Sequence, residues 1–282
     1  MTEPPSPDAR TQDELALVRA ARAGDRVALE SLLAREAPRV MRFALRLCPH
    51  ATDAEDVLQE TLLAAARGIG ALEHEAALTS WLYTIARSHC VKRARRRRDA
   101  PRALEPLEAA EGEAAPSTDA PDESLGNRRL GRALEEAIAG LEPIARDVIL
   151  LRDVEGLSAP ETADVLGIGL EAVKSRLHRA RAQLRVSLEP IVSPAEPTVP
   201  SDPACPDIVD VLSRHLEGEI GKDACAAMEQ HIETCTSCSH ACASLRSTLA
   251  LCHASHDAPL DAAARERVRR VLHRVVQRVI QR

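Results

Sequence analysis

Apolar residues recur at helical spacing along most of the chain, and the clearest example lies between residues 156 and 185. Ser158 and Glu161 have the spacing of a capping box, which predicts that a helix begins directly after the serine. The glycines at 167–169 predict a tight turn that ends this helix. A second, amphipathic helix is then expected, because apolar residues repeat every three or four positions: Leu170, Val173, Leu177, Ala180 and Leu184.

This second helix is basic on the faces opposite its apolar stripe. Two helices joined by a glycine-containing turn, the second one basic, are typical of a helix-turn-helix. In that motif the start of the second helix enters the major groove, where its side chains meet base edges and phosphates. The candidate DNA-contacting residues are Glu171, Ala172, Lys174, Ser175, Arg176, His178, Arg179 and Arg181. An ordinary helical hairpin with a solvated basic face is the alternative interpretation.

The same periodicity divides the rest of the chain. It predicts helices from residue 13, with breaks at Gly24 and Pro38 and a capping box at Thr52 and Glu55. Two stretches without periodicity, one acidic and one rich in proline, are predicted linkers. We therefore expect an all-α protein with a disordered start (1–12), a first helical domain (13–98), an acidic linker (99–127), a second helical domain (128–188), a proline-rich linker (189–206), a cysteine-rich unit (207–256) and a basic amphipathic helix (260–282).

Composition supports a helical core. The chain has one Trp, one Tyr and one Phe, so its core must be aliphatic, which favours packed helices over sheets. Although the net charge of −6 argues against nucleic acid, the charges are segregated. Residues 87–98 contain seven Lys or Arg and no acid, whereas residues 99–126 contain eight acids and one Arg. The acidity is thus concentrated in a linker.

Neither a membrane-spanning run nor a signal-peptide pattern is present, so we expect a cytoplasmic protein without stable membrane insertion. In that compartment the eight cysteines are expected to be thiols or metal ligands rather than structural disulfides. Cys48 and Cys90 fall in the first helical domain and are interpreted as small core residues.

The other cysteines cluster near the end of the chain. His231, Cys235 and Cys238 form an H-x3-C-x2-C pattern, and on one helix these positions share a face. Nitrogen and sulfur ligands of this kind predict a closed, tetrahedral zinc site. Cys205 is the favoured fourth ligand, with Cys242 and Cys225 as alternatives. Copper or cadmium binding and a thiol–disulfide switch stay open, because soft thiolates bind those ions and oxidation would eject the metal.

Two motif blocks resemble the sigma-70 family of bacterial RNA polymerase sigma factors. DAEDVLQET at 53–61 and SWLYTIAR at 80–87, followed by the basic run, resemble region 2, and residues 146–185 resemble region 4. The absence of a domain between the blocks is similar to the extracytoplasmic-function group. The cysteine-rich unit resembles zinc-binding anti-sigma factors, with Cys205 at the position of that family's first ligand.

The resemblance implies a role for each block. Core RNA polymerase would be contacted by Asp53, Glu55, Asp56, Gln59 and Glu60; the −10 promoter element by Trp81, Tyr83, Arg87, Lys92, Arg93, Arg95 and Arg96; and the −35 element by the candidate DNA-contacting residues of the helix-turn-helix. Unstacked bases bind on aromatic faces, and arginines hold phosphates. A solvated helix face for the acids, and plain core packing for Trp81 and Tyr83, are the alternatives.

The resemblance thus implies a promoter-specificity subunit, not an enzyme, whose partners are core RNA polymerase, promoter DNA and, in cis, its own zinc-binding C-terminal domain. Tethering favours regulation in cis because it raises the effective concentration of that domain to about the millimolar range. The first alternative is a helix-turn-helix regulator that works without polymerase. The second is a metal-handling protein whose basic helices only mediate contacts.

Overall fold

A computed structural model describes residues 12–48, 50–99, 123–192 and 205–279. The regular elements within these ranges are all helices, as the aliphatic composition predicts. Within the same ranges, no helix combines the length and the apolar character needed to cross a membrane. The predicted disordered start and the central parts of both predicted linkers lie outside the described residues.

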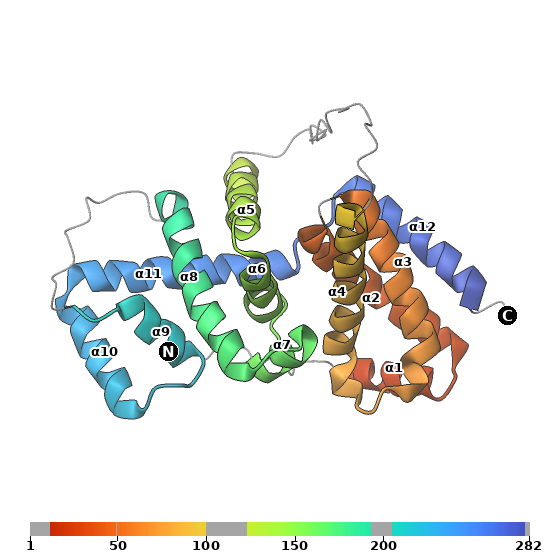
Figure 1. The fold of residues 1–282 in the computed structure, drawn as a ribbon, viewed down its shortest axis with the longest axis horizontal. Helices are drawn as coiled ribbons and strands as arrows, with labels where there is room; N and C mark the ends of the chain where they lie inside the picture. Colours follow the sequence, from red (N-terminus) through yellow and green to blue (C-terminus); the bar gives the residue numbers. More distant parts are fainter. Residues whose placement is uncertain (1–11, 49, 100–122, 193–204, 280–282) are drawn as a thin grey trace.

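The first domain is a bundle of four helices (Figure 1). They are α1 (Gln12–Arg22), α2 (Arg26–Leu47), α3 (Ala51–Gly68) and α4 (Leu78–Asp99), with two 3₁₀ turns, η1 (Ile69–Ala71) and η2 (Glu75–Ala77), between the last two. The Asp25 side chain caps α2 by accepting hydrogen bonds from the backbone N–H groups of Val27 and Ala28. Leu58 on α3 and Phe43 on α2 are completely buried in the core.

Two local predictions in this domain are wrong. Pro38 does not interrupt a helix but lies inside α2. The lost backbone hydrogen bond is tolerated because Ala37 and Val40, on either side of the proline, are fully buried and hold the helix in place. The predicted capping box of α3 is absent, because the helix starts earlier, with His50 as its N-cap residue and Thr52 inside its first turn.

The second domain contains the predicted helix-turn-helix. Its elements are α5 (Glu123–Ala139), α6 (Pro143–Ile149), a π-helical turn η3 (Leu150–Val154), α7 (Ala159–Leu166) and α8 (Leu170–Val192). The capping box forms as predicted, since Ser158 N–H donates to Glu161 Oε2 at 2.8 Å and Glu161 N–H donates to Ser158 Oγ at 3.3 Å. Gly167 ends α7 in the left-handed region, at φ 65°.

Both predicted linkers are shorter than the sequence suggests. α5 begins at Glu123, within the predicted acidic linker, and α8 continues past residue 188 to Val192. α8 includes Pro190, a residue that is common in linkers. The helix continues because Leu188, the last residue of the predicted domain, is fully buried one turn before the end of α8.

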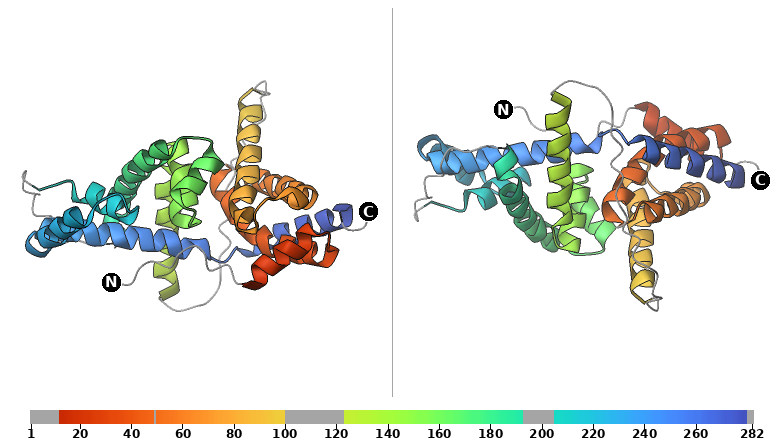
Figure 2. Two further views of the ribbon diagram at one scale, coloured as in Figure 1. Left: turned by 90° about the horizontal axis from the view of Figure 1, so that it is seen from below. Right: turned by 90° about the horizontal axis from the view of Figure 1, so that it is seen from above.

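The C-terminal unit extends across the whole molecule. It comprises α9 (Ile208–Leu216), α10 (Lys222–Thr234), α11 (Thr236–His256) and α12 (Ala262–Val279). α11 packs first on α9 and α10 and then on α8, η3 and α5, and α12 packs on α2 and α3 of the first domain (Figures 1 and 2). The basic tail therefore folds onto the first domain, an outcome that the sequence did not indicate.

α12 is held by an apolar stripe. Its buried residues, Ala264, Val268, Val271 and Val275, join the same hydrophobic cluster as the first two domains. Burying a valine side chain stabilises by roughly 1.5 kcal/mol or more. The cysteine-rich end has a separate, smaller core, made of Ile208, Leu212, Met228, Cys238, Cys242, Leu245 and Leu249.

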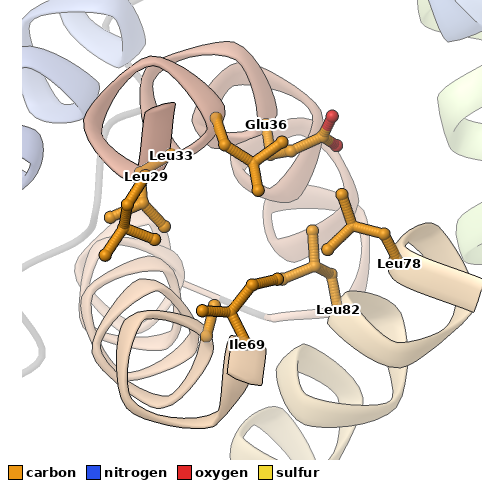
Figure 3. Close-up of a pocket in the computed structure, with 8 residues that line it drawn as sticks. Leu29, Leu33, Glu36, Ile69, Leu78 and Leu82 are labelled. Carbon is orange, nitrogen blue, oxygen red and sulfur yellow. The ribbon is translucent and has the colours of Figure 1, made fainter. Parts of the chain in front are cut away.

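A small apolar pocket lies between α2, the start of α4 and η1 (Figure 3). Its lining includes Leu29, Ile69 and Leu82, and its volume is about 10 Å³. Because that volume holds roughly one water molecule, the pocket is a packing defect rather than a ligand site.

Candidate functional site

The four residues predicted to bind a metal come together at the far end of the C-terminal unit. The ligand atoms of Cys205, His231, Cys235 and Cys238 all lie within 4.8 Å of one another. Cys205 precedes α9, His231 lies in the last turn of α10, and Cys238 lies in the first turn of α11. Three sulfurs and one imidazole nitrogen form the donor set of a structural zinc site.

The side chains of this cluster fit a metal ion. Nε2 of His231 is buried and has no hydrogen-bond partner among the described residues, which is an expensive arrangement unless a cation occupies the cluster. The backbone N–H of Cys238 lowers the pKa of the Cys235 thiol, whereas burial raises the pKa of Cys238 to about 12. A metal ion would offset the second effect by stabilising the thiolate.

The path of the chain through this cluster differs from the prediction. His231, Cys235 and Cys238 do not lie on one helix, because Cys235 has extended backbone angles (φ −108°, ψ 106°) and separates α10 from α11. The break lets α10 fold back on α11. The two alternative fourth ligands lie elsewhere: Cys225 contacts Nδ1 of His215 at 3.3 Å, and Cys242 is buried in the small core.

The start of the C-terminal unit covers one face of α8, the predicted recognition helix. Nδ1 of His178 lies 2.7 Å from Ser213 Oγ on α9. Lys174 Nζ lies 3.5 Å from a carboxylate oxygen of Glu219, just after α9. Two of the candidate DNA-contacting residues are thus engaged by the unit that follows them in the chain.

Arg181 was predicted to contact DNA, but the structure buries its side chain. It is 2% exposed and makes a bidentate pair with Asp153 at 2.6 and 2.9 Å, together with a bond to Glu217 at 2.8 Å. The Asp153 pair lies within the second domain, so it does not depend on α9. Helical spacing already places Arg181 beside Leu177 and Leu184 of the apolar stripe, but it cannot show that η3 supplies an acid at this position.

The remaining candidates on α8 differ in exposure. Glu171, Ser175 and Arg179 are exposed, whereas Ala172 is half-buried. The guanidinium of Arg176, also half-buried, donates to the Ala172 carbonyl at 3.0 Å. The outer face of α8 therefore stays open while its inner face is covered.

The acidic helix α3 is partly covered as well. Glu55 faces three arginines of α12, with carboxylate distances of 2.7 Å to Arg274, 3.2 Å to Arg270 and 3.9 Å to Arg267. The other predicted polymerase contacts differ in solvent exposure: Asp53 is buried, Gln59 is half-buried, and Asp56 and Glu60 are exposed. Asp56 also pairs with Arg93 at 2.8 Å.

α4 carries the residues predicted to bind the −10 element. Tyr83 is 1% exposed and its ring lies 4.5 Å from that of Phe43, so it occupies a core position, the alternative left open by the sequence. Arg87 pairs with Asp147 of α6 at 2.7 Å. Trp81 is half-buried against the core, whereas Lys92, Arg95 and Arg96 are exposed at the basic end of the helix.

Family comparisons agree with these two domains and with the metal cluster. Residues 32–100 match the model for sigma-70 region 2, residues 131–184 the model for sigma-70 region 4, and residues 205–239 a putative zinc-finger model. The chain is 35% identical over 162 residues to the ECF RNA polymerase sigma factor SigM of Mycobacterium tuberculosis, covering 57% of this chain and 78% of SigM. It is 37% identical over 164 residues to the RNA polymerase sigma factor CarQ of Myxococcus xanthus, covering 58% and 91%.

The chain belongs to the extracytoplasmic-function sigma factors. It is therefore a subunit that directs bacterial RNA polymerase to promoters. The first domain is region 2 and the second domain is region 4.

In this sigma factor, regions 2 and 4 and the C-terminal unit meet at one buried carboxylate, which the sequence did not reveal. The Glu155 side chain, 2% exposed, accepts a hydrogen bond from the Tyr83 hydroxyl and lies 3.7 Å from Arg46 and 3.1 Å from His256 of α11. Burial, and then the Glu155 carboxylate, raises the pKa of Tyr83, so its hydroxyl stays protonated and donates. The role of Glu155 could not be predicted from the sequence, because its three partners come from segments that are distant in the chain.

Proposed function

We propose that this sigma factor is held inactive by its own C-terminal unit, which binds Zn²⁺ and covers surfaces that regions 2 and 4 need for polymerase and promoter. We call the arrangement in which α9–α12 contact both regions the closed form. The observation that carries the proposal is that one C-terminal segment contacts the recognition helix through Ser213 and Glu219 and the acidic helix through Arg270 and Arg274.

Region 4 would be restrained at the inner face of α8. In the closed form, Lys174 and His178 cannot both contact DNA while they hold Glu219 and Ser213. The exposed residues Glu171, Ser175 and Arg179 are left to read or hold DNA, and only one of them is a cation that could hold a phosphate. Release of α9 would return Lys174 and His178 to the −35 interface.

Region 2 would be restrained twice. α12 neutralises Glu55, one of the acids proposed to hold core RNA polymerase, and also covers α2 and α3. Arg87, proposed to act at the −10 element, is held by Asp147 of region 4, and the core residue Tyr83 ties region 2 to Glu155 of region 4. Separating the two regions would therefore free Arg87 for the promoter, which fits activation by opening.

Zinc would hold the C-terminal unit together. Cys205, His231, Cys235 and Cys238 would bind it, and the ion would tie the start of α9 to the junction of α10 and α11. The core of this end is small, with seven buried residues, and domains of that size commonly need a metal for stability. Loss of zinc or oxidation of its thiolates would release α9 and open the sigma factor.

The test is reconstituted transcription over a genomic library with core polymerase, comparing the zinc-loaded full chain with a chain that ends at Val192. The proposal predicts higher promoter-specific output from the shorter chain, and an increase for the full chain after zinc chelation. Equal output from both chains, with or without zinc, would refute regulation by the C-terminal unit while leaving the sigma-factor assignment intact.

A transcription assay with a variant of α8 tests the alternative that the chain is a metal-handling protein whose basic helices only mediate contacts. Loss of promoter-specific initiation in the Lys174→Ala, Arg176→Ala double variant would exclude it. The family match to both sigma-70 regions argues against a regulator that works without polymerase.

A further inference from the structure

Two cysteines of region 2, far in sequence from the zinc cluster, lie against each other. Cys48 ends α2 and Cys90 lies in α4, and their Sγ atoms are 2.6 Å apart. We propose that Cys48 and Cys90 form a redox-active dithiol in region 2, which a hydroperoxide converts reversibly into a disulfide. This proposal is independent of the zinc site and of the closed form.

The geometry favours a disulfide over the alternatives. A disulfide bond is about 2.05 Å long, so the two sulfur atoms need to approach each other by only about half an ångström. Such a small shift does not require α2 and α4 to move apart. A metal site is disfavoured, because the single cluster of three or more potential metal ligands found among the described residues is the one at Cys205. Simple core packing would not require two sulfurs to lie closer than van der Waals contact.

The surroundings favour one thiolate. The Cys48 thiol donates a hydrogen bond that lowers the pKa of Cys90, and Arg87 acts in the same direction. These effects outweigh burial and the carboxylates of Asp147 and Asp53, which raise that pKa. Each of the two cysteines is 7% exposed, whereas Cys252, a solitary thiol in α11, is fully buried. A small peroxide therefore has better access to the pair than to Cys252.

Oxidation of the Cys48–Cys90 pair takes two steps. The Cys90 thiolate attacks the terminal oxygen of the hydroperoxide R–OOH; the O–O bond breaks, an alcohol leaves, and Cys90 becomes a sulfenic acid. Cys48 then loses its proton and attacks that sulfur, the S–S bond forms, and water leaves. In sum, two thiols are oxidised by two electrons and one hydroperoxide is reduced to an alcohol and water.

The cross-link would tie the end of α2 to α4 and close a loop over a separation of 42 residues. A loop of this length stabilises a fold mainly by restricting the unfolded chain. We expect the unfolding temperature of region 2 to rise by about 10 °C on oxidation. Arg87 and Arg93, each one turn from Cys90, would be restrained with it.

The experiment uses the zinc-loaded full chain, reduced, freed of reductant, treated with a few equivalents of H₂O₂ and blocked with N-ethylmaleimide. After trypsin digestion, mass spectrometry should detect the peptide 47–67 joined to the peptide 88–92, and dithiothreitol should separate them. Cys90→Ser and Cys48→Ala should abolish the linked pair and the rise in unfolding temperature, and Cys252→Ser, the matched control, should keep both.

Recovery of Cys48 and Cys90 as two alkylated thiols, while other cysteines are oxidised, would overturn the proposal. A disulfide from Cys90 to a cysteine of the C-terminal unit, or irreversible oxidation of Cys90 without a cross-link, would overturn it as well. Zinc release, followed with a chromogenic chelator in the same samples, reports separately on the metal site.

Discussion

The C-terminal unit contacts regions 4 and 2 by different means. At region 4 the contact made by α9 and the residues after it is polar and buried: the Arg181 and Glu217 side chains are each 3% exposed, and Ser213 is fully buried. At region 2 the contact is an apolar stripe bordered by solvent-exposed ion pairs, since the Arg270 and Arg274 side chains are about half exposed. The first kind of contact depends on exact partners and the second on buried area, so the two should respond differently to mutation, salt and metal.

The largest effect is expected from removing a metal ligand. Cys238→Ser should abolish stable zinc binding and unfold the region 4 contact, because structural zinc contributes on the order of 10 kcal/mol in zinc-finger peptides. Metal content by mass spectrometry and hydrogen exchange in α9 measure this. Cys225→Ser, outside the ligand cluster, is the control and should retain zinc. Full zinc content in the Cys238 variant would show that the ligand set is wrong.

The second largest effect is expected at Glu217. Glu217→Gln removes the carboxylate that Arg181 and Arg152 share at 2.8 and 3.0 Å. Breaking a buried pair costs roughly 3–5 kcal/mol, but Asp153 still neutralises Arg181, so we expect about 2 kcal/mol. Faster hydrogen exchange in α9 and higher transcription should follow.

Asp210→Asn on α9 is the matched control for Glu217. Asp210 pairs with Arg214 at a half-exposed position, where ion pairs contribute little. If both variants behave alike, the buried network does not hold α9 to region 4.

A smaller effect is expected at the region 2 contact. Arg270→Glu with Arg274→Glu places acids against Glu55 and should weaken α12 docking by about 1 kcal/mol, because the ion pairs are exposed and the valine stripe remains. Affinity for core polymerase should rise about fivefold. Arg269→Glu with Arg278→Glu, exposed arginines that do not pair with Glu55, adds the same charge and should leave affinity unchanged.

The smallest effect concerns the ion pair between regions 2 and 4. Burial raises the pKa of Asp147 despite its pair with Arg87 at 2.7 Å. Because the pKa is higher in the folded than in the unfolded state, the protonated form is favoured on folding. The contribution of Asp147 to the free energy of unfolding is therefore complete below its ordinary pKa of 3.8. That contribution is lost as the pH rises through the pKa that Asp147 has in the folded state.

Asp147→Asn should therefore flatten the pH dependence of unfolding above pH 3.8 and change stability at neutral pH by less than about 1 kcal/mol. Chemical unfolding between pH 4 and 7 measures this. A large loss of stability at pH 7 would mean that this pair contributes more to the contact between regions 2 and 4 than the burial of its carboxylate allows.

Local signals were predictable from the sequence, and contacts between distant segments were not. The capping box at Ser158 and the gathering of Cys205 with His231, Cys235 and Cys238 depend on short spacings or a known motif, and the structure has both. The helix break at Cys235 was missed, because a run that fits one helix face also fits a turn between two helices.

The long-range features required the tertiary structure. The valines of α12 predicted an amphipathic helix but could not name the surface that it covers. Arg181 lies four residues after Leu177 and three before Leu184, at the edge of the apolar stripe, whereas the exposed Arg179 lies on the opposite side of the helix. The sequence thus carried a signal that Arg181 is buried, but it could not identify Asp153 in η3 as its partner. Which basic residues of a helix reach DNA is thus decided by neighbouring elements.

The most direct measurement of the central claim is the equilibrium affinity for core RNA polymerase of the zinc-loaded full chain and of the chain that ends at Val192. If the C-terminal unit covers the polymerase-binding surface, the shorter chain should bind at least tenfold more tightly, a difference of about 1.4 kcal/mol. Equal affinities of the two chains would contradict the account.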